Sequence, residues 1–232
     1  MSIFVTGNIQ RIAEYGACRF SSRSWPRGRE LTRDDVAIVA GDFGFVWNDS
    51  NTDRYWLDWF ESKPWTTCFV DGNHENHQLL SELPVREWHG SRAHMVRPHV
   101  PHLMRGEAFD IAGTRLLAMG GATSNDIELR RVGVNWWPQE VPGDREMVHC
   151  RAVLDRAGWS VDYVVTHEAP AAIAEGLCRE HGREFVNNRL QRFLGELDAR
   201  LQFRSWFFGH YHGDEWRDAR HRLVYQDIVA LE

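Results

Sequence analysis

Five short polar clusters contain the residue types that metal and phosphate chemistry require. Aspartate, asparagine and histidine recur in them, together with glycine. Oxygen and imidazole groups are suitable ligands for manganese, iron, zinc or cobalt, and no sulfur is needed. Glycine lets the backbone turn sharply and lets an ion or phosphate approach closely. The clusters are Thr6-Gly7-Asn8-Ile9-Gln10, Gly41-Asp42-Phe43-Gly44, Asp71-Gly72-Asn73-His74-Glu75, Thr166-His167-Glu168 and Gly209-His210-Tyr211-His212.

A short apolar run precedes each cluster. Continuous β-branched or aromatic runs are typical of strands buried on both faces, and helical patterns lie between them. Strands alternating with helices predict a largely parallel sheet, whose carboxyl ends meet at one edge where ligands bind. The five clusters should therefore converge. The predicted strands are residues 3–5, 36–40, 67–70, 161–165 and 206–208, and the predicted helices are residues 52–62, 144–157 and 184–201.

Two further stretches change the expected architecture. Residues 94–121 are typical of short strands, with a hairpin about Ala112-Gly113, and residues 223–231 alternate as a strand. This mixture predicts an α/β protein with two packed sheets flanked by helices. No repeat, low-complexity run or Pro/Gly/Ser-rich linker interrupts the chain, so a single domain over residues 1–232 is expected.

Composition narrows the class of protein. With 43% hydrophobic and 26% charged residues, the chain has the balance of a globular protein. Its net charge of −6 makes duplex nucleic acid an unlikely partner. The four cysteines form no CxxC pair, no apolar run of membrane-spanning length occurs, and the first residues do not read as a signal peptide. We expect a cytoplasmic protein without a membrane span.

In this order the clusters resemble the signature of the calcineurin-like metallophosphoesterases, which reads GDxH, GD, GNH(E/D), H and GHxH. The resemblance runs from Gly7 to His212, and the last four blocks match residue by residue. It implies a four-layer α/β sandwich of two mixed β-sheets flanked by helices. It also implies a hydrolase that cleaves a phosphate ester or anhydride by attack of a metal-bound hydroxide. The implied cofactors are divalent ions of manganese, iron, zinc, cobalt or nickel.

The resemblance also assigns roles to individual residues. Asp42 would bridge two ions, which clamp the attacking and leaving oxygens of the phosphate. His74 would orient the phosphate or protonate the leaving group. One ion would be held by Asp42 with Asn73, His167 and His210, and the other by Asp42 with His212, Asn8 and Gln10.

The first block departs from the family pattern, because Asn8 and Gln10 stand where the family has aspartate and histidine. Neutral amides are poorer ligands, and even loss of an outer-shell partner costs roughly 10–100-fold in metal affinity. One tight ion and a second that is weak or absent are therefore expected. The chain is then an active phosphoesterase, a single-metal enzyme, or a degenerate member acting as a non-catalytic binding or scaffold protein. No Asp-Arg-Gly follows Gly41-Asp42, which argues against the phosphoprotein phosphatase branch.

The remaining signals concern the substrate. A phosphorylated small molecule or nucleotide is expected, with its specificity set by loops such as residues 120–141. In that loop, Ser124 could lie near the metals, and Trp136-Trp137 is a candidate substrate contact. Arg130 and Arg131 could bind a second phosphate, although solvated surface positions are favoured. Aromatic residues of the helix 52–62 should fill the core. The histidines expected to lie outside the site are His77, His89, His94, His99, His102, His149, His181 and His221, with lining of the cleft left open as an alternative for His94 and His102.

Overall fold

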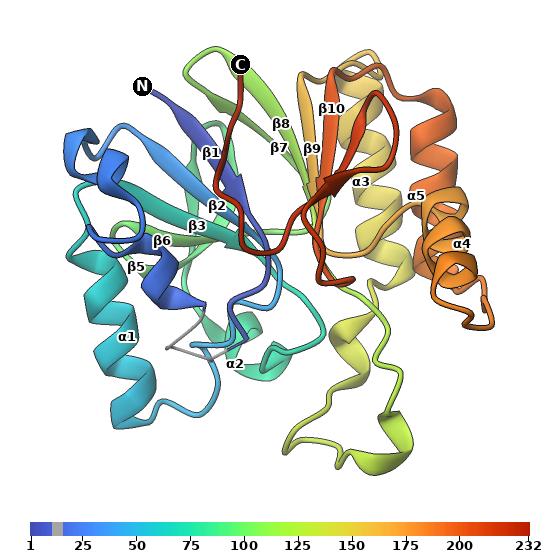
Figure 1. The fold of residues 1–232 in the computed structure, drawn as a ribbon, viewed down its shortest axis with the longest axis horizontal. Helices are drawn as coiled ribbons and strands as arrows, with labels where there is room; N and C mark the ends of the chain where they lie inside the picture. Colours follow the sequence, from blue (N-terminus) through green and yellow to red (C-terminus); the bar gives the residue numbers. More distant parts are fainter. Residues whose placement is uncertain (11–15) are drawn as a thin grey trace.

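Two β-sheets packed face to face form the centre of the molecule, as seen in a computed structural model that describes residues 1–10 and 16–232 (Figure 1). In each sheet the inner strands run parallel and antiparallel strands lie at the edges. The first sheet has the order β13 (Val229–Ala230), β1 (Ile3–Thr6), β2 (Val36–Ala40), β3 (Thr66–Val70), β6 (Val100–Leu103), β5 (Ser91–Arg97) and β4 (Val85–Trp88). The second has the order β11 (Glu215–Trp216), β12 (His221–Leu223), β10 (Ser205–Phe208), β9 (Tyr163–Thr166), β8 (Thr114–Met119) and β7 (Glu107–Ile111).

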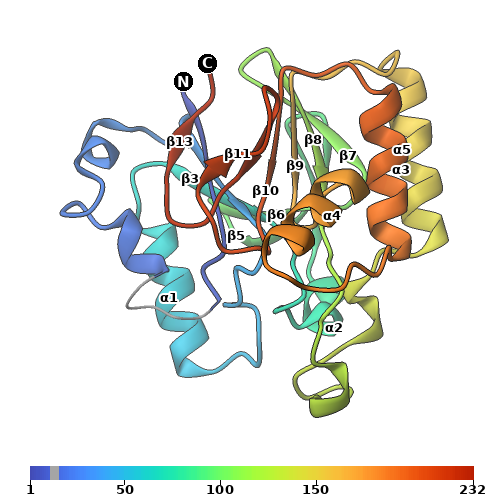
Figure 2. The ribbon, with the colours of Figure 1, turned by 45° about the vertical axis from the view of Figure 1, so that its right-hand side comes forward.

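Helices cover the outer faces of both sheets. Figure 1 shows α1 outside the first sheet and α3, α4 and α5 outside the second, and the turned view of Figure 2 has the same arrangement. Short 3₁₀ segments lie at residues 17–20, 26–30, 127–129 and 138–140. The α-helices are α1 (Asn51–Glu61), α2 (His77–Glu82), α3 (Asp144–Arg156), α4 (Ala171–Glu180) and α5 (Arg189–Arg200).

The buried strands divide their side chains between two core regions. In β1, Ile3 and Val5 face the second sheet, whereas Phe4 packs under the outer layer next to α1. In β10, Phe207 lies between the sheets and Trp206 packs toward α3 and α5. Because both faces of these strands are covered, their sequences carry consecutive apolar residues instead of alternating. Helix, sheet, sheet and helix therefore form four layers, and the predicted fold class is confirmed.

The predicted helix over residues 184–201 is wrong at its start. Helix α5 begins at Arg189, where the Asn188 side chain accepts from the Gln191 backbone N–H and the Gln191 side chain accepts from the Asn188 N–H. This capping box fixes the start of the helix. The apolar pattern before it, including Phe185, belongs to an irregular connection. Helix α4 was not predicted at all.

The predicted strand over residues 223–231 is also wrong over most of its length. Only Val229–Ala230 pairs with β1, while β12 ends at Leu223. Asp214 accepts the backbone N–H groups of Tyr225, Gln226 and Asp227 at 2.7, 3.1 and 3.0 Å. A carboxylate that takes three successive amides bends this segment into a turn, which the apolar alternation does not reveal.

Helix α1 departs from its prediction in one residue. Tyr55 was expected to lie on the buried stripe with Trp56, Trp59 and Phe60, yet it is 62% exposed. Phe60 is fully buried, and the two tryptophans are half-buried. The face of α1 that packs on the sheet therefore includes Trp56, Trp59 and Phe60 but not Tyr55. Over the part of the chain that the structure describes, no helix is long and apolar enough to cross a membrane.

Candidate active site

Five strand ends build the candidate site. The carboxyl ends of β1, β2, β3, β9 and β10 lie on one side of the two sheets, the lower side in Figure 1, so the five polar clusters meet there. A cavity of about 780 Å³ opens at this edge. The polar clusters, residues 123–130 and the connection between α4 and α5 surround it. From the clusters, the cavity is lined by Gln10, Asp42, Asn73, His74, Glu168, His210, Tyr211 and His212.

Asp42, Asn73 and His167 form the buried centre of the site. His167 Nε2 lies 3.2 Å from Asp42 Oδ1 and 3.3 Å from Asn73 Oδ1. On the other side of the ring, His167 Nδ1 lies 2.8 Å from the Ala40 carbonyl oxygen and donates to it. Burial alone would lower the pKa of His167, but Asp42 outweighs burial and raises it, which favours an Nε2–H that donates to Asp42 Oδ1. Metal binding requires loss of this proton, and the lone pair then left on Nε2 faces two oxygen atoms in an arrangement suited to a cation.

These donors fit a divalent ion. Atoms bound to one ion at about 2.0–2.2 Å lie roughly 3.0–3.4 Å apart, and the two separations measured from His167 fall in that range. Among the described residues, no group of three His, Cys, Asp or Glu side chains could hold a metal ion. The convergent set contains one carboxylate, one imidazole and one amide, so its fit depends on the Asn73 amide oxygen.

His210 lies beside this centre and packs edge to face on the His167 ring. Its ring centroid is 5.1 Å from that of His167, and its backbone N–H donates to Asn8 Oδ1 at 3.1 Å. Burial lowers the pKa of His210, and burial likewise lowers the pKa of His212. Both rings are thereby kept neutral, which is the form that binds metal. The ligand role of His210 stays a prediction.

The amides of the first block occupy the other side of Asp42. Asn8 Nδ2 donates to Asp42 Oδ2 at 3.1 Å, and Gln10 Nε2 donates to the same oxygen at 3.3 Å. Gln10 Nε2 also lies 2.8 Å from His212 Nε2, so the amide N–H₂ sits between a carboxylate and an imidazole. These are the acceptor atoms that the family resemblance gives to a second ion. Here an uncharged donor satisfies them.

The charge of Asp42 is stabilised from several directions. Burial alone would raise its pKa, but His167 and the His74 backbone N–H, which donates at 2.9 Å, outweigh burial and hold the pKa of Asp42 below its ordinary value. The opposite holds for Glu75, whose pKa is well raised by burial and by the nearby Asp42 and Asp71 charges. Glu75 accepts the N–H groups of Phe43 and Gly44 at 2.7 and 3.1 Å. It thus holds the turn that follows Asp42.

The backbone of the site is held in an uncommon conformation. Asp42, Gln10, His210 and His212 have φ values of 52°, 55°, 67° and 55°, in the left-handed region that non-glycine residues seldom adopt. Each such residue costs on the order of 1–3 kcal/mol and persists only where the surroundings enforce it. Close packing enforces it here, because a Cβ on Gly72 would lie 2.1 Å from Asp42 Oδ1.

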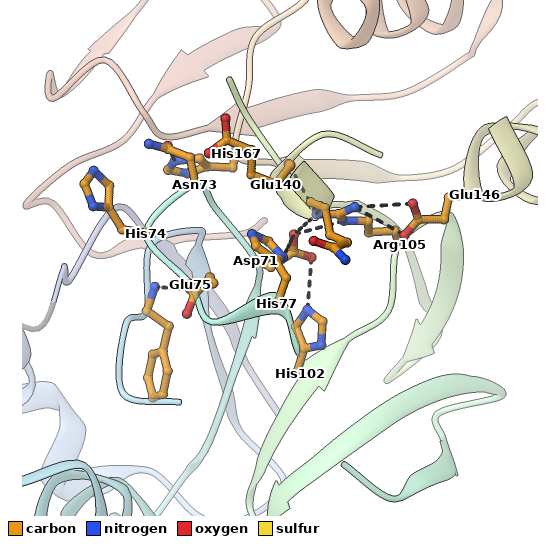
Figure 3. Close-up of polar contacts among 12 residues, drawn as sticks. Asp71, Asn73, His74, Glu75, His77, His102, Arg105, Glu140, Glu146 and His167 are labelled. Carbon is orange, nitrogen blue, oxygen red and sulfur yellow. Dashed lines mark hydrogen bonds and ion pairs between the residues drawn. The ribbon is translucent and has the colours of Figure 1, made fainter. Parts of the chain in front are cut away.

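His74 and Arg130 extend the site toward the open cavity. Figure 3 shows His74 projecting away from Asp71 and its partners. Arg130 Nη2 lies 3.5 Å from His74 Nε2, and Arg130 Nε pairs with Asp126 at 2.7 Å. The Arg130 side chain is only 9% exposed and lines the cavity, so its expected position on the solvated surface is wrong. Arg131 is exposed as expected. His181, also expected outside the site, lines the same cavity.

A buried charged cluster behind the site was not predicted. Asp71, which is 1% exposed, accepts from Arg105 at 2.9 and 2.5 Å and lies 3.1 Å from His102 Nε2 (Figure 3). His102 in turn contacts His94 through their Nδ1 atoms at 3.0 Å. These two histidines therefore support the strand that carries Asn73 and do not line the cavity. The charge at position 71 beside Gly-Asn-His was the signal that could have indicated this cluster.

Trp136 and Trp137 differ in how deeply they are buried. Trp137 is 6% exposed and packs edge to face on Trp47, with ring centroids 5.4 Å apart. It anchors the segment of residues 120–143, which projects on the same side as the site in Figures 1 and 2. Trp136 is half-buried. Trp137 is thus packed as a core residue. For Trp136, contact with a substrate stays a prediction.

Comparison with known proteins gives one distant relative. No protein-family model matches the chain. The chain is 24% identical over 215 residues to the lariat debranching enzyme of Schizosaccharomyces pombe (strain 972 / ATCC 24843), an alignment that covers 79% of this chain and 44% of the relative. The chain thus spans less than half the length of that curated relative. Together with the two-sheet fold, this similarity supports the metallophosphoesterase superfamily.

Proposed function

We propose that this protein is a metal-dependent phosphoesterase that hydrolyses a phosphate ester or anhydride of a phosphorylated small molecule or nucleotide. The carrying observation is the convergence of Asp42 Oδ1 and Asn73 Oδ1 on His167 Nε2, at 3.2 and 3.3 Å, at the floor of a cavity of about 780 Å³. Once Nε2 has lost its proton, three lone pairs that face one another attract a dication and leave the open side for a phosphate.

Asp42, Asn73, His167 and His210 would hold the tight ion. A divalent ion supplies charge neutralisation to the phosphoryl oxygens and makes water a better nucleophile at neutral pH. The chain itself provides the remaining functions. The His167 Nδ1–H bond to Ala40 fixes the ring so that Nε2 faces the ion, and Asp42 contributes the negative charge.

His74 and Arg130 would act on the substrate. Their side chains line the cavity next to Asn73 and form a pair of nitrogen-bearing groups 3.5 Å apart. His74 is in position to give a proton to the leaving oxygen, and Arg130 to bind a phosphoryl oxygen or a second anionic group. Among the described residues one carboxylate, Asp126, pairs with Arg130, and a guanidinium has five N–H donors, so donors are left for an anion.

Metal occupancy would be asymmetric. The amide N–H₂ of Gln10 and the amide of Asn8 already satisfy Asp42 Oδ2 and His212 Nε2, the atoms on which a second ion would depend. A second dication would have to displace these hydrogen bonds. The residues of the first block, Asn8 and Gln10, could offer it only neutral amide oxygens in return. We therefore propose one tight ion, with the second weak or absent.

The test is metal content combined with hydrolysis. Protein purified without chelator should contain close to one equivalent of divalent metal and should hydrolyse a generic aryl phosphate. Manganese, zinc, cobalt, nickel and iron should each be tried, on monoester and diester substrates. Bound metal without turnover on either substrate class would decide for a non-catalytic binding protein. Absence of both metal and turnover would overturn the proposed function.

A further inference from the structure

Glu140 is a buried carboxylate outside the five clusters. It is 1% exposed and lies in the projecting segment of residues 120–143. Both of its oxygens are taken by one residue: Oε1 accepts the Ser124 backbone N–H at 2.8 Å, and Oε2 accepts the Ser124 hydroxyl at 2.7 Å. Ser124 Oγ also lies 3.1 Å from Asn73 Nδ2. A continuous chain of hydrogen bonds therefore joins Glu140 to Asn73, whose side chains lie on the same side of Asp71 in Figure 3.

The direction of these hydrogen bonds follows from the types of group involved. A carboxylate only accepts, so the single hydroxyl proton of Ser124 goes to Glu140 Oε2. Ser124 Oγ then has only lone pairs to offer Asn73, which must present its Nδ2–H₂ group. The Asn73 amide is thereby oriented with Oδ1 toward His167 Nε2, 3.3 Å away.

We propose that Ser124 and Glu140 are positioning residues that set the orientation of the Asn73 amide and through it the affinity of the site for a divalent metal ion. This inference rests on the proposed function, since it assumes that Asn73 Oδ1 is a ligand. An amide reversed by 180° would present N–H₂ to the ion, and a cation is repelled by such a group. Outer-shell partners that orient a ligand are typically worth 10–100-fold in metal affinity.

The projecting segment is anchored to the strand end that carries Asn73. Arg105 donates to the backbone oxygens of Gln139 and Glu140 at 2.8 and 3.3 Å while it pairs with Asp71, two residues before Asn73. The Gly121 N–H also donates to the Asp71 carbonyl at 2.8 Å. We call Ser124 and Glu140 the clamp. Because the clamp and Asn73 are held by the same anchors, the fold fixes the distance between Ser124 and Asn73.

The isosteric change Glu140→Gln tests the direction of the hydrogen bonds that link Glu140 through Ser124 to Asn73. The Ser124 backbone N–H can only donate, so the new amide must place its oxygen there and its N–H₂ against Ser124 Oγ. The hydroxyl then accepts from residue 140 and donates to Asn73, which turns over to accept. We expect the Kd for Mn²⁺, measured by isothermal titration calorimetry, to rise about 10–100-fold.

Two further variants separate orientation from simple loss of structure. Ser124→Ala removes the hydroxyl that links Glu140 to Asn73 and leaves the orientation of the Asn73 amide unconstrained. Once the hydroxyl is absent, Glu140→Gln has no group through which to reverse Asn73. The double variant should therefore bind Mn²⁺ within about twofold of Ser124→Ala alone, a difference inside the usual error of such cycles. Glu107→Gln is the matched control, because Glu107 is also buried and is held by Arg92 and His149 away from the site.

Each outcome decides one proposal. Wild-type protein that binds neither Mn²⁺ nor any of the other four ions, and that hydrolyses neither substrate, overturns the proposed function. A wild type that binds, together with a folded Glu140→Gln variant of unchanged Kd, overturns the clamp and leaves the proposed function standing. Independent, multiplicative effects of the two substitutions would likewise reduce Glu140 to a structural residue. If Glu140→Gln fails to fold, Ser124→Ala decides alone, and an unchanged Kd for that variant contradicts the inference.

Discussion

His74 and Asp42 are adjacent in the site and differ in what their loss should do. His74 reaches the cavity, and only its backbone N–H contacts Asp42. His74→Ala should lower kcat by about 10²–10⁴-fold if the ring acts as a general acid, while metal content stays nearly intact. Asp42→Ala should lower metal content and kcat together. Metal analysis and steady-state kinetics on the same preparations check both, and loss of metal in His74→Ala would contradict the assignment.

The amides of the first block are open to a gain-of-function test. Asn8→Asp with Gln10→His restores the family's residues and removes the N–H₂ groups that satisfy Asp42 Oδ2 and His212 Nε2. The paired change should raise the metal stoichiometry toward two and increase the rate of hydrolysis, because a carboxylate compensates the dehydration of a second dication. Elemental analysis measures the stoichiometry. If both quantities stayed as in the wild type, the first block would not be what limits the second ion.

Arg130 lines the cavity, whereas the next residue, Arg131, is exposed and serves as its matched control. Arg130→Gln should raise KM about tenfold or more, the range for lost hydrogen bonds to charged groups, with less effect on kcat. Arg131→Gln removes an exposed charge next to it in sequence and should leave KM unchanged. Equal effects of the two substitutions on KM would show that only net charge matters. A larger effect on a dianionic monoester than on a monoanionic diester would identify the extra charge as the group bound.

At the scale of elements, His221 joins β12 to α5. Its ring lies 3.2 Å from Asp198 of α5 and 2.8 Å from Asp218, and its side chain is nearly buried. Burial alone would lower the pKa of His221, but the two carboxylates outweigh burial and raise it above its ordinary value of 6.5. A raised folded-state pKa gives stability that is fully present below about pH 6.5 and is lost as pH rises through the folded value.

His221→Asn should therefore destabilise the protein more at pH 6 than at pH 9. Urea denaturation at the two pH values measures the difference, with His89→Asn as a control on a histidine outside this pair of carboxylates. The same penalty at both pH values would mean that packing of the ring, and not its charge, holds β12 against α5.

Sequence reasoning succeeded where one local rule determines the structure. Buried parallel strands carry consecutive apolar residues and are followed by polar turns, so β2 was found at its observed limits and the clusters containing Asp42, Asn73 and His167 were found at strand ends. It failed where long-range contacts decide. The Asp214 turn and the Glu140 clamp depend on residues that meet only after folding, and no periodicity marks them.

For the whole molecule, removal of metal should lower thermal stability. The convergent donors come from both sheets, so an ion bound there stabilises the folded state alone. At a free concentration of 100 times Kd, binding contributes about 2.7 kcal/mol, which corresponds to roughly 5–10 °C in Tm for a chain of this size. Differential scanning calorimetry with EDTA and with added Mn²⁺ measures the shift. An identical Tm in both conditions would mean that no ion is bound in the folded state.

The order of the strands along the chain has a consequence for how the protein folds. Apart from β13, every strand of the first sheet precedes every strand of the second, so Asp42 and Asn73 leave the ribosome long before His167 and His210. Contacts between such distant residues form late, because loop closure must be completed first. The nascent first half therefore holds Asp42 and Asn73 without His167 and His210, the imidazoles proposed to complete the ion's surroundings. An ion held as proposed could bind only after β9 and β10 have been synthesised, and β13 pairs with β1 only after the second sheet has been synthesised.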